Sequence, residues 1–167
     1  MAGGPAGPGP WHAAMARALA EARAAAAAGD IPVGAALLDT DGQVVAAAGN
    51  QREQTGDPTA HAEVVVLRAA AAARGSWRLE GCTLVVTLEP CTMCAGALVL
   101  ARVARLVFGA YDPKAGAVAS LWDVVRDRRL NHRVEVRGGI EAEACGQVLR
   151  EFFEGQRGAT ATGSDSP

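Results

Sequence analysis

The stretch CTLVVTLEPCTMCAGA, residues 82–97, decides the fold of this chain of 167 residues. Its first half, CTLVVTL, is an unbroken apolar and β-branched run, which is typical of a strand that is buried on both faces. Pro90 then favours a helix start, because proline is well tolerated near the first position of a helix. In a helix from Cys91 to about Ala101, the thiols of Cys91 and Cys94 lie three positions apart and share one face. We therefore expect a two-thiol motif on a helix that directly follows a buried strand.

Short apolar runs alternate with segments of good helix formers along the rest of the chain. The patterns predict helices over residues 11–28, 60–73, 91–101, 121–126 and 141–156, and strands over residues 31–38, 44–48, 82–88, 105–108 and 133–136. The cluster DTDG at residues 39–42 predicts a hairpin between the first two strands. Thr59 is the expected N-cap of the second helix. Because helices alternate with buried strands, we predict an α/β fold built as a three-layer α/β/α sandwich.

Length and composition indicate one domain, because half of the residues are apolar and suffice for one sizeable core. Residues 1–10 and 158–167 are rich in Gly, Pro, Ala, Thr or Ser, so we expect disordered tails around a domain of residues 11–157. The net charge of −2 lacks the basic field of a non-specific nucleic-acid binder. No apolar run approaches the roughly 20 residues that span a bilayer, and residues 1–10 do not resemble a signal peptide. We expect a cytoplasmic protein with no membrane partner.

Two of the four cysteines, Cys82 and Cys145, lie outside the motif in apolar surroundings. We interpret both as small buried hydrophobic residues. An even cysteine count could indicate disulfides, but a C-x-x-C motif in a cytosolic chain favours a metal or redox role. The motif alone leaves two alternatives open, a thioredoxin-like dithiol and half of a structural zinc site.

His61, in the stretch DPTAHAE, narrows these alternatives. A lone histidine at a predicted helix start is more often structural, but beside Glu63 and a downstream P-C-x-x-C it is better explained as a metal ligand. One imidazole and two thiolates hold Zn²⁺ by three corners of a tetrahedron, and the fourth corner can take a water molecule that the metal acidifies. A structural zinc site needs a fourth protein ligand, and neither His12 nor His132 has the spacing for that role.

Glu63 is the candidate general acid and base. The alternative is a solvent-exposed helical carboxylate, but Glu63 is followed by VVVL, a run that we expect to be buried on at least one side. A carboxylate beside an acidified water can take its proton and pass it to a ring nitrogen and then to departing ammonia. The pattern H-x-E…P-C-x-x-C is the known signature of zinc-dependent nucleobase deaminases.

The chain resembles the cytidine deaminase superfamily and, within it, the bacterial tRNA-specific adenosine deaminases, over nearly all of residues 11–157. The zinc motif identifies only the superfamily. Beyond the metal motif, the resemblance includes IPVGA at 31–35 and GNQRE at 49–53. The resemblance to the tRNA enzymes in particular rests on the DPK-x-GA-x-x-SL pattern within FGAYDPKAGAVASLWDV at 108–124, on NHRV within NHRVEV at 131–136 and on FF at 152–153.

This resemblance implies a cytidine-deaminase-like five-stranded mixed sheet with helices on both faces, usually assembled as a homodimer. It implies one Zn²⁺ per subunit on His61, Cys91 and Cys94, with Glu63 as the proton shuttle. The implied reaction converts adenosine to inosine at the wobble position of an arginine tRNA with anticodon ACG. Hydroxide adds to C6 of the flipped-out base, and ammonia leaves.

The resemblance also implies contacts with the tRNA anticodon stem-loop. Asn50 would hydrogen-bond the target nucleotide, and the backbone of Ala62 would contact the base. The remaining implied contacts are Asp112, Lys114, Phe152 and Phe153. Taken alone, an asparagine after a hairpin strand, an Asp-Pro turn and two aromatic residues on a terminal helix are also ordinary structural features.

Recognition of flanking RNA is less well defined by the sequence. Residues 126–137, RDRRLNHRVEVR, hold five arginines and His132 against two acidic residues. This segment is either a local phosphate-binding strip or a surface belt of salt bridges. A single-stranded loop needs only local phosphate contacts, stacking and edge reading, so an acidic chain is compatible with RNA binding. Tyr111 and the neutral C-terminal tail depart from the family pattern, so we expect different contacts with flanking RNA and unchanged chemistry.

Two other functions remain open from the sequence. A deaminase of the same superfamily that acts on a free base or nucleoside, such as guanine or cytosine, would share the zinc site. A non-catalytic zinc or dithiol module that binds a partner through its arginines would share the metal motif without needing Glu63.

Overall fold

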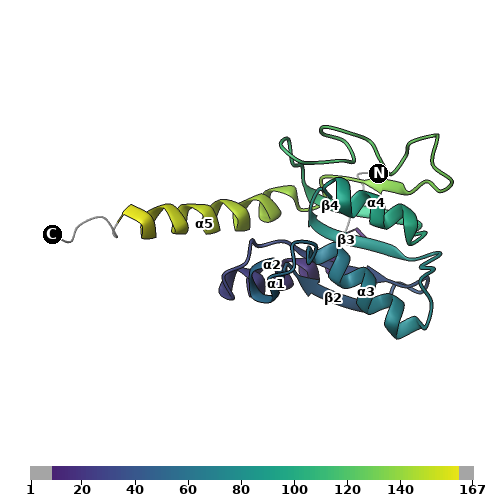
Figure 1. The fold of residues 1–167 in the computed structure, drawn as a ribbon, viewed down its shortest axis with the longest axis horizontal. Helices are drawn as coiled ribbons and strands as arrows, with labels where there is room; N and C mark the ends of the chain where they lie inside the picture. Colours follow the sequence, from purple (N-terminus) through teal and green to yellow (C-terminus); the bar gives the residue numbers. More distant parts are fainter. Residues whose placement is uncertain (1–8, 162–167) are drawn as a thin grey trace, which may run out of the picture.

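One five-stranded mixed sheet forms the centre of the molecule, which a computed structural model describes over residues 9–161 (Figure 1). The strand order is β2-β1-β3-β4-β5. Strand β1 is antiparallel to β2 and β3, whereas β3, β4 and β5 are parallel to one another. The strands are β1 (Gly34–Leu38), β2 (Val44–Gly49), β3 (Thr83–Leu88), β4 (Arg105–Ala110) and β5 (Glu135–Arg137). The expected five-stranded mixed sheet is confirmed.

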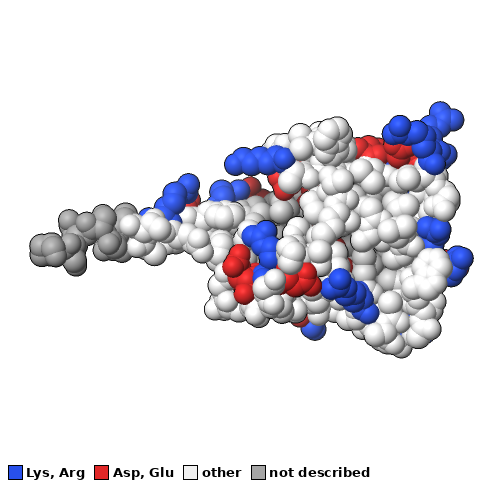
Figure 2. Space-filling view, in the orientation of Figure 1, with Lys and Arg blue, Asp and Glu red and all other residues white. Residues whose placement is uncertain are grey.

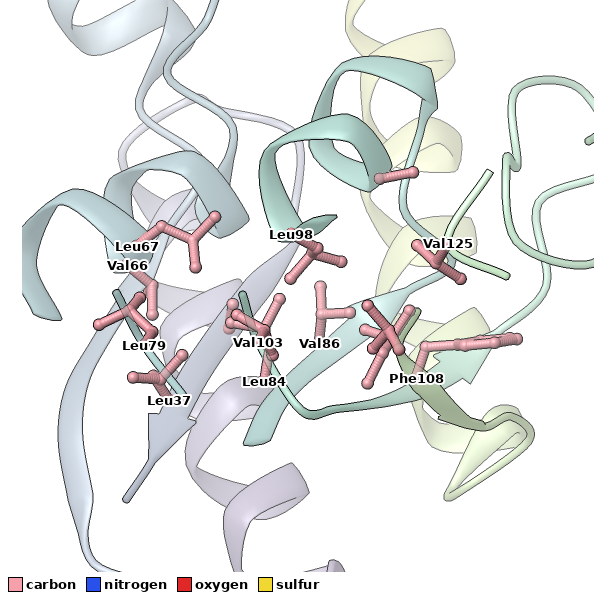
Figure 3. Close-up of a cluster of buried hydrophobic side chains, with 14 of the residues drawn as sticks. Leu37, Val66, Leu67, Leu79, Leu84, Val86, Leu98, Val103, Phe108 and Val125 are labelled. Atoms are coloured by element: carbon pink, nitrogen blue, oxygen red, sulfur yellow. The ribbon is translucent and has the colours of Figure 1, made fainter. Parts of the chain in front are cut away.

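Helices cover both faces of this sheet, as a three-layer sandwich requires. They are α1 (His12–Ala27), α2 (Arg52–Thr55), α3 (Ala62–Arg74), α4 (Thr92–Leu100) and α5 (Ala142–Ala161). Because side chains alternate along a strand, Val85 of β3 packs on the side of α1 and α5, whereas Leu84 and Val86 pack on the side of α3 and α4. The hydrophobic cluster on the side of α3 and α4 is the larger of the two and also contains Val66 and Leu98 (Figure 3).

The helices that carry the motifs begin slightly later than predicted. Helix α3 has His61 as its N-cap residue, and α4 has Cys91. Both residues have extended backbone conformations, with ψ of 151° and 176°. The expected N-cap, Thr59, instead donates a hydrogen bond from its hydroxyl to Asp57. Two candidate metal ligands therefore occupy equivalent positions, one at the entrance of each helix.

The predicted helix over residues 121–126 is wrong. This segment is an irregular loop in which the backbone amide of Val124 donates to the carbonyl of Ala117, seven residues earlier and beyond helical spacing. The side-chain guanidinium of Arg126 donates to the carbonyl of Val118. In contrast, α2 was not predicted. It is a single turn whose amides at Glu53 and Gln54 donate to the carboxylate of the buried Asp30.

Helix α5 is longer than predicted and extends away from the sheet (Figure 1). It continues through residues 158–161, which the sequence had placed in a disordered tail. The remaining expected tail segments, residues 1–8 and 162–167, lie outside the described residues. Within residues 9–161, none of the helices combines the length and the apolar character needed to cross a membrane.

Candidate active site

A cavity of about 150 Å³ lies at the edge of the sheet where β2, β3 and β4 end and β1 begins. The helix entrances at His61 and Cys91 line it. Its volume is below the roughly 300 Å³ at which drug-sized pockets begin, so it suits only a small ligand. The lining residues are Ile31, Val33, Asn50, Arg52, His61, Ala62, Glu63, Leu88, Glu89, Cys91, Asp112 and Ala115.

Three side chains meet at this cavity with the geometry of a metal site. The Nδ1 atom of His61 lies 3.6 Å from the Sγ atom of Cys91 and 3.6 Å from that of Cys94. With ligand bonds of about 2.3 Å for Zn–S and about 2.1 Å for Zn–N, a tetrahedral ion holds sulfur and nitrogen about 3.6 Å apart. The three residues thus fit one zinc ion, and the predicted ligand set comes together.

The part of the chain that the structure describes offers no fourth ligand to this group. His12 lies 3.2 Å from a carboxylate oxygen of Glu141, and the ring of His132 lies 2.7 Å from the carbonyl oxygen of Val103. Three protein ligands are typical of catalytic zinc, because structural zinc takes four. The arrangement therefore argues against a purely structural zinc site.

The contact between the two thiols of the motif moves their pKa values in opposite directions. The contact with Cys94 is the main reason why the pKa of Cys91 falls to about 4, and His61 contributes to the decrease. The same contact raises the pKa of Cys94, and burial acts in the same direction. The lowered pKa favours the thiolate form of Cys91, which is the form that binds a metal. Cys82 and Cys145 are fully buried among apolar side chains, as predicted.

Glu63 lies in the first turn of α3 and lines the cavity beside the thiols. Its side chain is only 4% exposed, so the alternative of a solvent-exposed carboxylate is wrong. Burial is the main reason why the pKa of Glu63 rises to about 7. A carboxyl group held beside a reacting water can accept a proton and return it later, as general acid–base chemistry requires.

Asn50, a residue of the cavity wall, has an unpaired acceptor. Its backbone amide donates to the carbonyl of Val33, which fixes the residue after β2. Its side-chain Oδ1 atom is buried and has no hydrogen-bond partner among the described residues. An unsatisfied buried acceptor costs about 1–3 kcal/mol. Asn50 is therefore a candidate for a hydrogen bond with a ligand that carries a donor.

The other predicted contact residues are only partly brought together. Ala62 and Asp112 line the cavity, but Lys114 does not. Its backbone amide donates to the Asp112 carboxylate in an exposed turn. Phe152 and Phe153 form an edge-to-face pair on α5, with ring centroids 5.5 Å apart, and neither lines the cavity.

Charged side chains of the arginine-rich segment mostly pair with acidic neighbours. Arg126, Arg129 and Arg137 form ion pairs with Asp123, Asp127 and Glu135, at 2.6–2.9 Å. On the face shown in Figure 2, basic groups are separate and several lie beside acidic ones. These pairs favour a surface salt-bridge belt over a continuous phosphate-binding strip.

Two polar residues of the cavity wall, Arg52 and Glu89, were not identified from the sequence. Glu89 is 2% exposed and directly precedes Pro90. The position of Glu89 between a predicted buried strand and the predicted metal-binding helix could have identified it. A carboxylate at such a position is buried, and a buried carboxylate needs hydrogen-bond partners. For Arg52 we find no comparable pattern in the sequence.

Comparison with known proteins gives a consistent result. Residues 11–110 match the cytidine and deoxycytidylate deaminase zinc-binding region. The chain is 48% identical over 139 residues to the tRNA-specific adenosine deaminase of Bacillus subtilis, covering 83% of this chain and 86% of that protein. A solved structure from a study of A-to-I editing by tRNA:A34 deaminases is 44% identical, with a TM-score of 0.79 over 82% of this chain and 99% of that one. A guanine deaminase structure from Nitrosomonas europaea is 27% identical, with a TM-score of 0.74 over 84% and 83% of the two chains.

Proposed function

The chain belongs to the family of deaminases that share the cytidine and deoxycytidylate deaminase zinc-binding region, and on this premise we propose that it converts adenosine to inosine at the wobble position of an arginine tRNA with anticodon ACG. The observation that carries the proposal is the buried carboxylate of Glu63 beside the His61, Cys91 and Cys94 group in a cavity of base size. The similarity to tRNA-specific adenosine deaminases over most of both chains supports RNA as the substrate.

In the proposed mechanism, His61, Cys91 and Cys94 would hold the zinc ion. When bound, zinc lowers the pKa of a water molecule so that hydroxide is available at neutral pH. Glu63 takes the proton from this water and delivers it to N1 of the adenine ring as oxygen adds to C6. Glu63 then takes the remaining proton of the added water from the C6 hydroxyl and gives it to the amino group, so that the C6–N bond breaks, ammonia leaves and a C6 carbonyl remains. Water and adenosine are consumed, and inosine and ammonia are formed.

Asn50 and Ala62 are proposed to hold the flipped-out base. The unpaired Oδ1 of Asn50 would accept a hydrogen bond from the nucleotide, which removes the cost of its burial. The backbone of Ala62 lies in the cavity wall, where it would contact the base edge. Because the cavity is small, a base can enter it only after it has left its stack, which is least costly in a single-stranded loop.

Contacts with flanking nucleotides are proposed for the cavity rim and for α5. Asp112 and Lys114 lie on one exposed turn at the rim. Phe152 and Phe153 lie on the helix that extends away from the sheet, where the half-exposed ring of Phe153 could stack on a splayed base.

We further propose a homodimer. An apolar hollow lies between α3 and α4, and two large side chains at it are strongly exposed: Trp77 by 57% and Leu100 by 71%. Exposed apolar patches of this kind commonly mark interaction surfaces, and a second copy would cover both. The cytoplasm is the proposed location, because free thiols at a zinc site require a reducing compartment.

The guanine deaminase similarity gives a second candidate, a free-base deaminase, with the same zinc chemistry. One assay separates the two candidates. The zinc-loaded protein is incubated with an ACG-anticodon stem-loop and, in parallel, with free guanine, cytosine, cytidine and adenosine. We expect ammonia release only with the RNA. Ammonia from a free base, with the RNA left unmodified, would replace the proposed substrate.

A further inference from the structure

Glu89 accepts an unusual concentration of hydrogen bonds from one irregular segment, residues 112–120. Its Oε1 atom accepts the backbone amides of Val118, Ala119 and Ser120, at 3.3, 2.7 and 2.9 Å. Its Oε2 atom accepts the amide of Asp112 at 2.9 Å and the hydroxyl of Ser120. The carboxylate is 2% exposed, so these five donors replace its water.

The segment is shaped around this carboxylate. A Cβ atom on Gly116 would lie 2.3 Å from the Cδ atom of Glu89, so only glycine leaves room for the group. The backbone of the same turn bonds to the start of the metal-binding helix: the amide of Ala117 donates to Pro90, and Gly116 forms an isolated bridge with Cys91. Glu89 thus lies where the segment meets the metal ligand.

The hydrogen bonds continue from Glu89 into the cavity rim. The amide of Asp112 is fixed by Glu89, and the side chain of Asp112 accepts the amides of Lys114 and Ala115. Asp112 and Ala115 line the cavity. Residues 112–120 contain no named helix or strand, and apart from Glu89 the segment is held mainly by single backbone bonds such as that from Ala117 to Pro90. Glu89 accepts more bonds from this segment than any other side chain, so we expect the position of the rim to depend strongly on it.

We propose that Glu89 is a positioning residue, which fixes residues 112–120 at the cavity rim so that Asp112 and Lys114 meet the RNA while Glu63 performs the chemistry. The inference rests on the proposed RNA substrate. Glu89 itself need not touch the reacting atoms. Its loss should weaken RNA binding more than turnover, because the rim contacts lie away from the bond that breaks.

The Glu89→Gln variant tests this role with little change in volume. An amide offers one oxygen, so its NH₂ group must face either the Asp112 amide or the three amides of residues 118–120. We expect KM for the ACG stem-loop to rise about 10- to 100-fold, as for the loss of charge-assisted hydrogen bonds, with kcat within about threefold and zinc content unchanged. Glu80→Gln, the same change at an exposed site, is the matched control and should behave as wild type.

A double-mutant cycle shows whether Glu89 acts through Asp112. If it does, the effects of Glu89→Gln and Asp112→Ala on KM are less than additive. Gly116→Ala disturbs the same contact from the loop side and should reproduce the rise in KM. This second variant keeps the test valid if Glu89→Gln does not fold. Additive effects, or a loss of kcat without a change in KM, would overturn the proposal.

Hydrogen exchange on the zinc-loaded protein provides a readout that does not depend on the substrate. In Glu89→Gln, the amides of Asp112 and of residues 118–120 should exchange at least about tenfold faster, because the bonds that protect them are weakened. The exchange rates of the amides of α3 should not change. Unchanged exchange over residues 112–120 would contradict the positioning role. If the wild type fails to modify the RNA while exchange responds as expected, the proposed substrate is wrong and the positioning of the rim stands.

Discussion

The Sγ atom of Cys91 lies 3.6 Å from the Nδ1 atom of His61, although 30 residues separate them in the chain. Both residues are N-caps, one of α3 and the other of α4. The sheet topology brings the two helix entrances together at the edge where β3 ends. Backbone amides at both helix starts point toward this meeting point and favour the thiolate. The metal site is thus a property of the fold and of two short motifs.

Replacing a metal ligand should remove zinc. We expect Cys91→Ser to lower the zinc content from about one ion per chain to less than about a tenth and to destabilise the fold, because metal binding contributes to the folding free energy. Elemental analysis and thermal unfolding measure both effects. Cys82→Ala, at a buried cysteine outside the site, is the control and should keep its zinc. A zinc-replete Cys91→Ser protein would contradict the ligand assignment.

Glu63→Gln should separate chemistry from metal binding. The amide keeps the size of the side chain but cannot shuttle protons, so turnover should fall about 10²- to 10⁴-fold or more, while zinc content and fold persist. Single-turnover inosine formation measures the loss of chemistry, and elemental analysis measures the zinc content. Glu80→Gln should retain full activity, because Glu80 is exposed and pairs with Arg78 on the surface. Wild-type activity in Glu63→Gln would instead support a non-catalytic zinc module.

Asn50→Ala should lower activity without lowering stability. The unpaired Oδ1 of Asn50 lacks a partner among residues 9–161, so removing it relieves a cost of about 1–3 kcal/mol. This gain offsets the packing lost with the side chain. We expect an unfolding free energy equal to or above that of the wild type and a higher KM for the RNA. A marked fall in stability would show that the side chain is already satisfied in the free protein.

Phe153→Ala should weaken RNA binding while leaving the reaction intact. Base–aromatic stacking contributes about 1–3 kcal/mol per base, and the Phe153 ring is half-exposed on α5. We expect a weaker Kd for the stem-loop, with kcat at saturating RNA unchanged. Phe153→Tyr retains the ring and should restore the affinity. An unchanged Kd in Phe153→Ala would remove α5 from the proposed RNA surface.

The stability contributed by Asp30 should depend on pH. Burial would raise the pKa of Asp30, but hydrogen bonds from Glu53 and Gln54 hold it below its ordinary value. Because the folded pKa is the lower one, the contribution is complete above about pH 4 and is lost as pH falls through the folded pKa. We expect Asp30→Asn to cost about 1.5–3 kcal/mol at pH 7 and less below pH 4, by urea unfolding. A pH-independent difference would contradict this account.

The parts of the structure that could be predicted are those encoded by contiguous residues. The apolar run of β3 and the following Pro-Cys motif define a strand and a helix start locally, and His61 and Glu63 stand in one short motif. Helix α2 and the segment after β4 could not be predicted in this way. They depend on buried carboxylates distant in sequence: Asp30 lies 23 residues before Glu53, and Glu89 lies 31 residues before Ser120.

The same distinction applies to the site. Asn50, Ala62 and Asp112 were predicted from family resemblance and line the cavity. Phe152 and Phe153 were predicted in the same way, but α5 carries them away from the sheet, so their role depends on RNA that extends beyond the cavity (Figure 1). Resemblance identifies the residues, whereas only the fold shows which of them meet.

We propose that the protein deaminates one adenosine in RNA at the cavity bounded by His61, Glu63 and Cys91. Mapping inosine at single-nucleotide resolution in an ACG-anticodon stem-loop tests it most directly. With zinc-loaded protein we predict inosine at the wobble adenosine and at no other position, and none with Glu63→Gln. An unmodified wobble adenosine after incubation with zinc-replete wild-type protein would contradict the account.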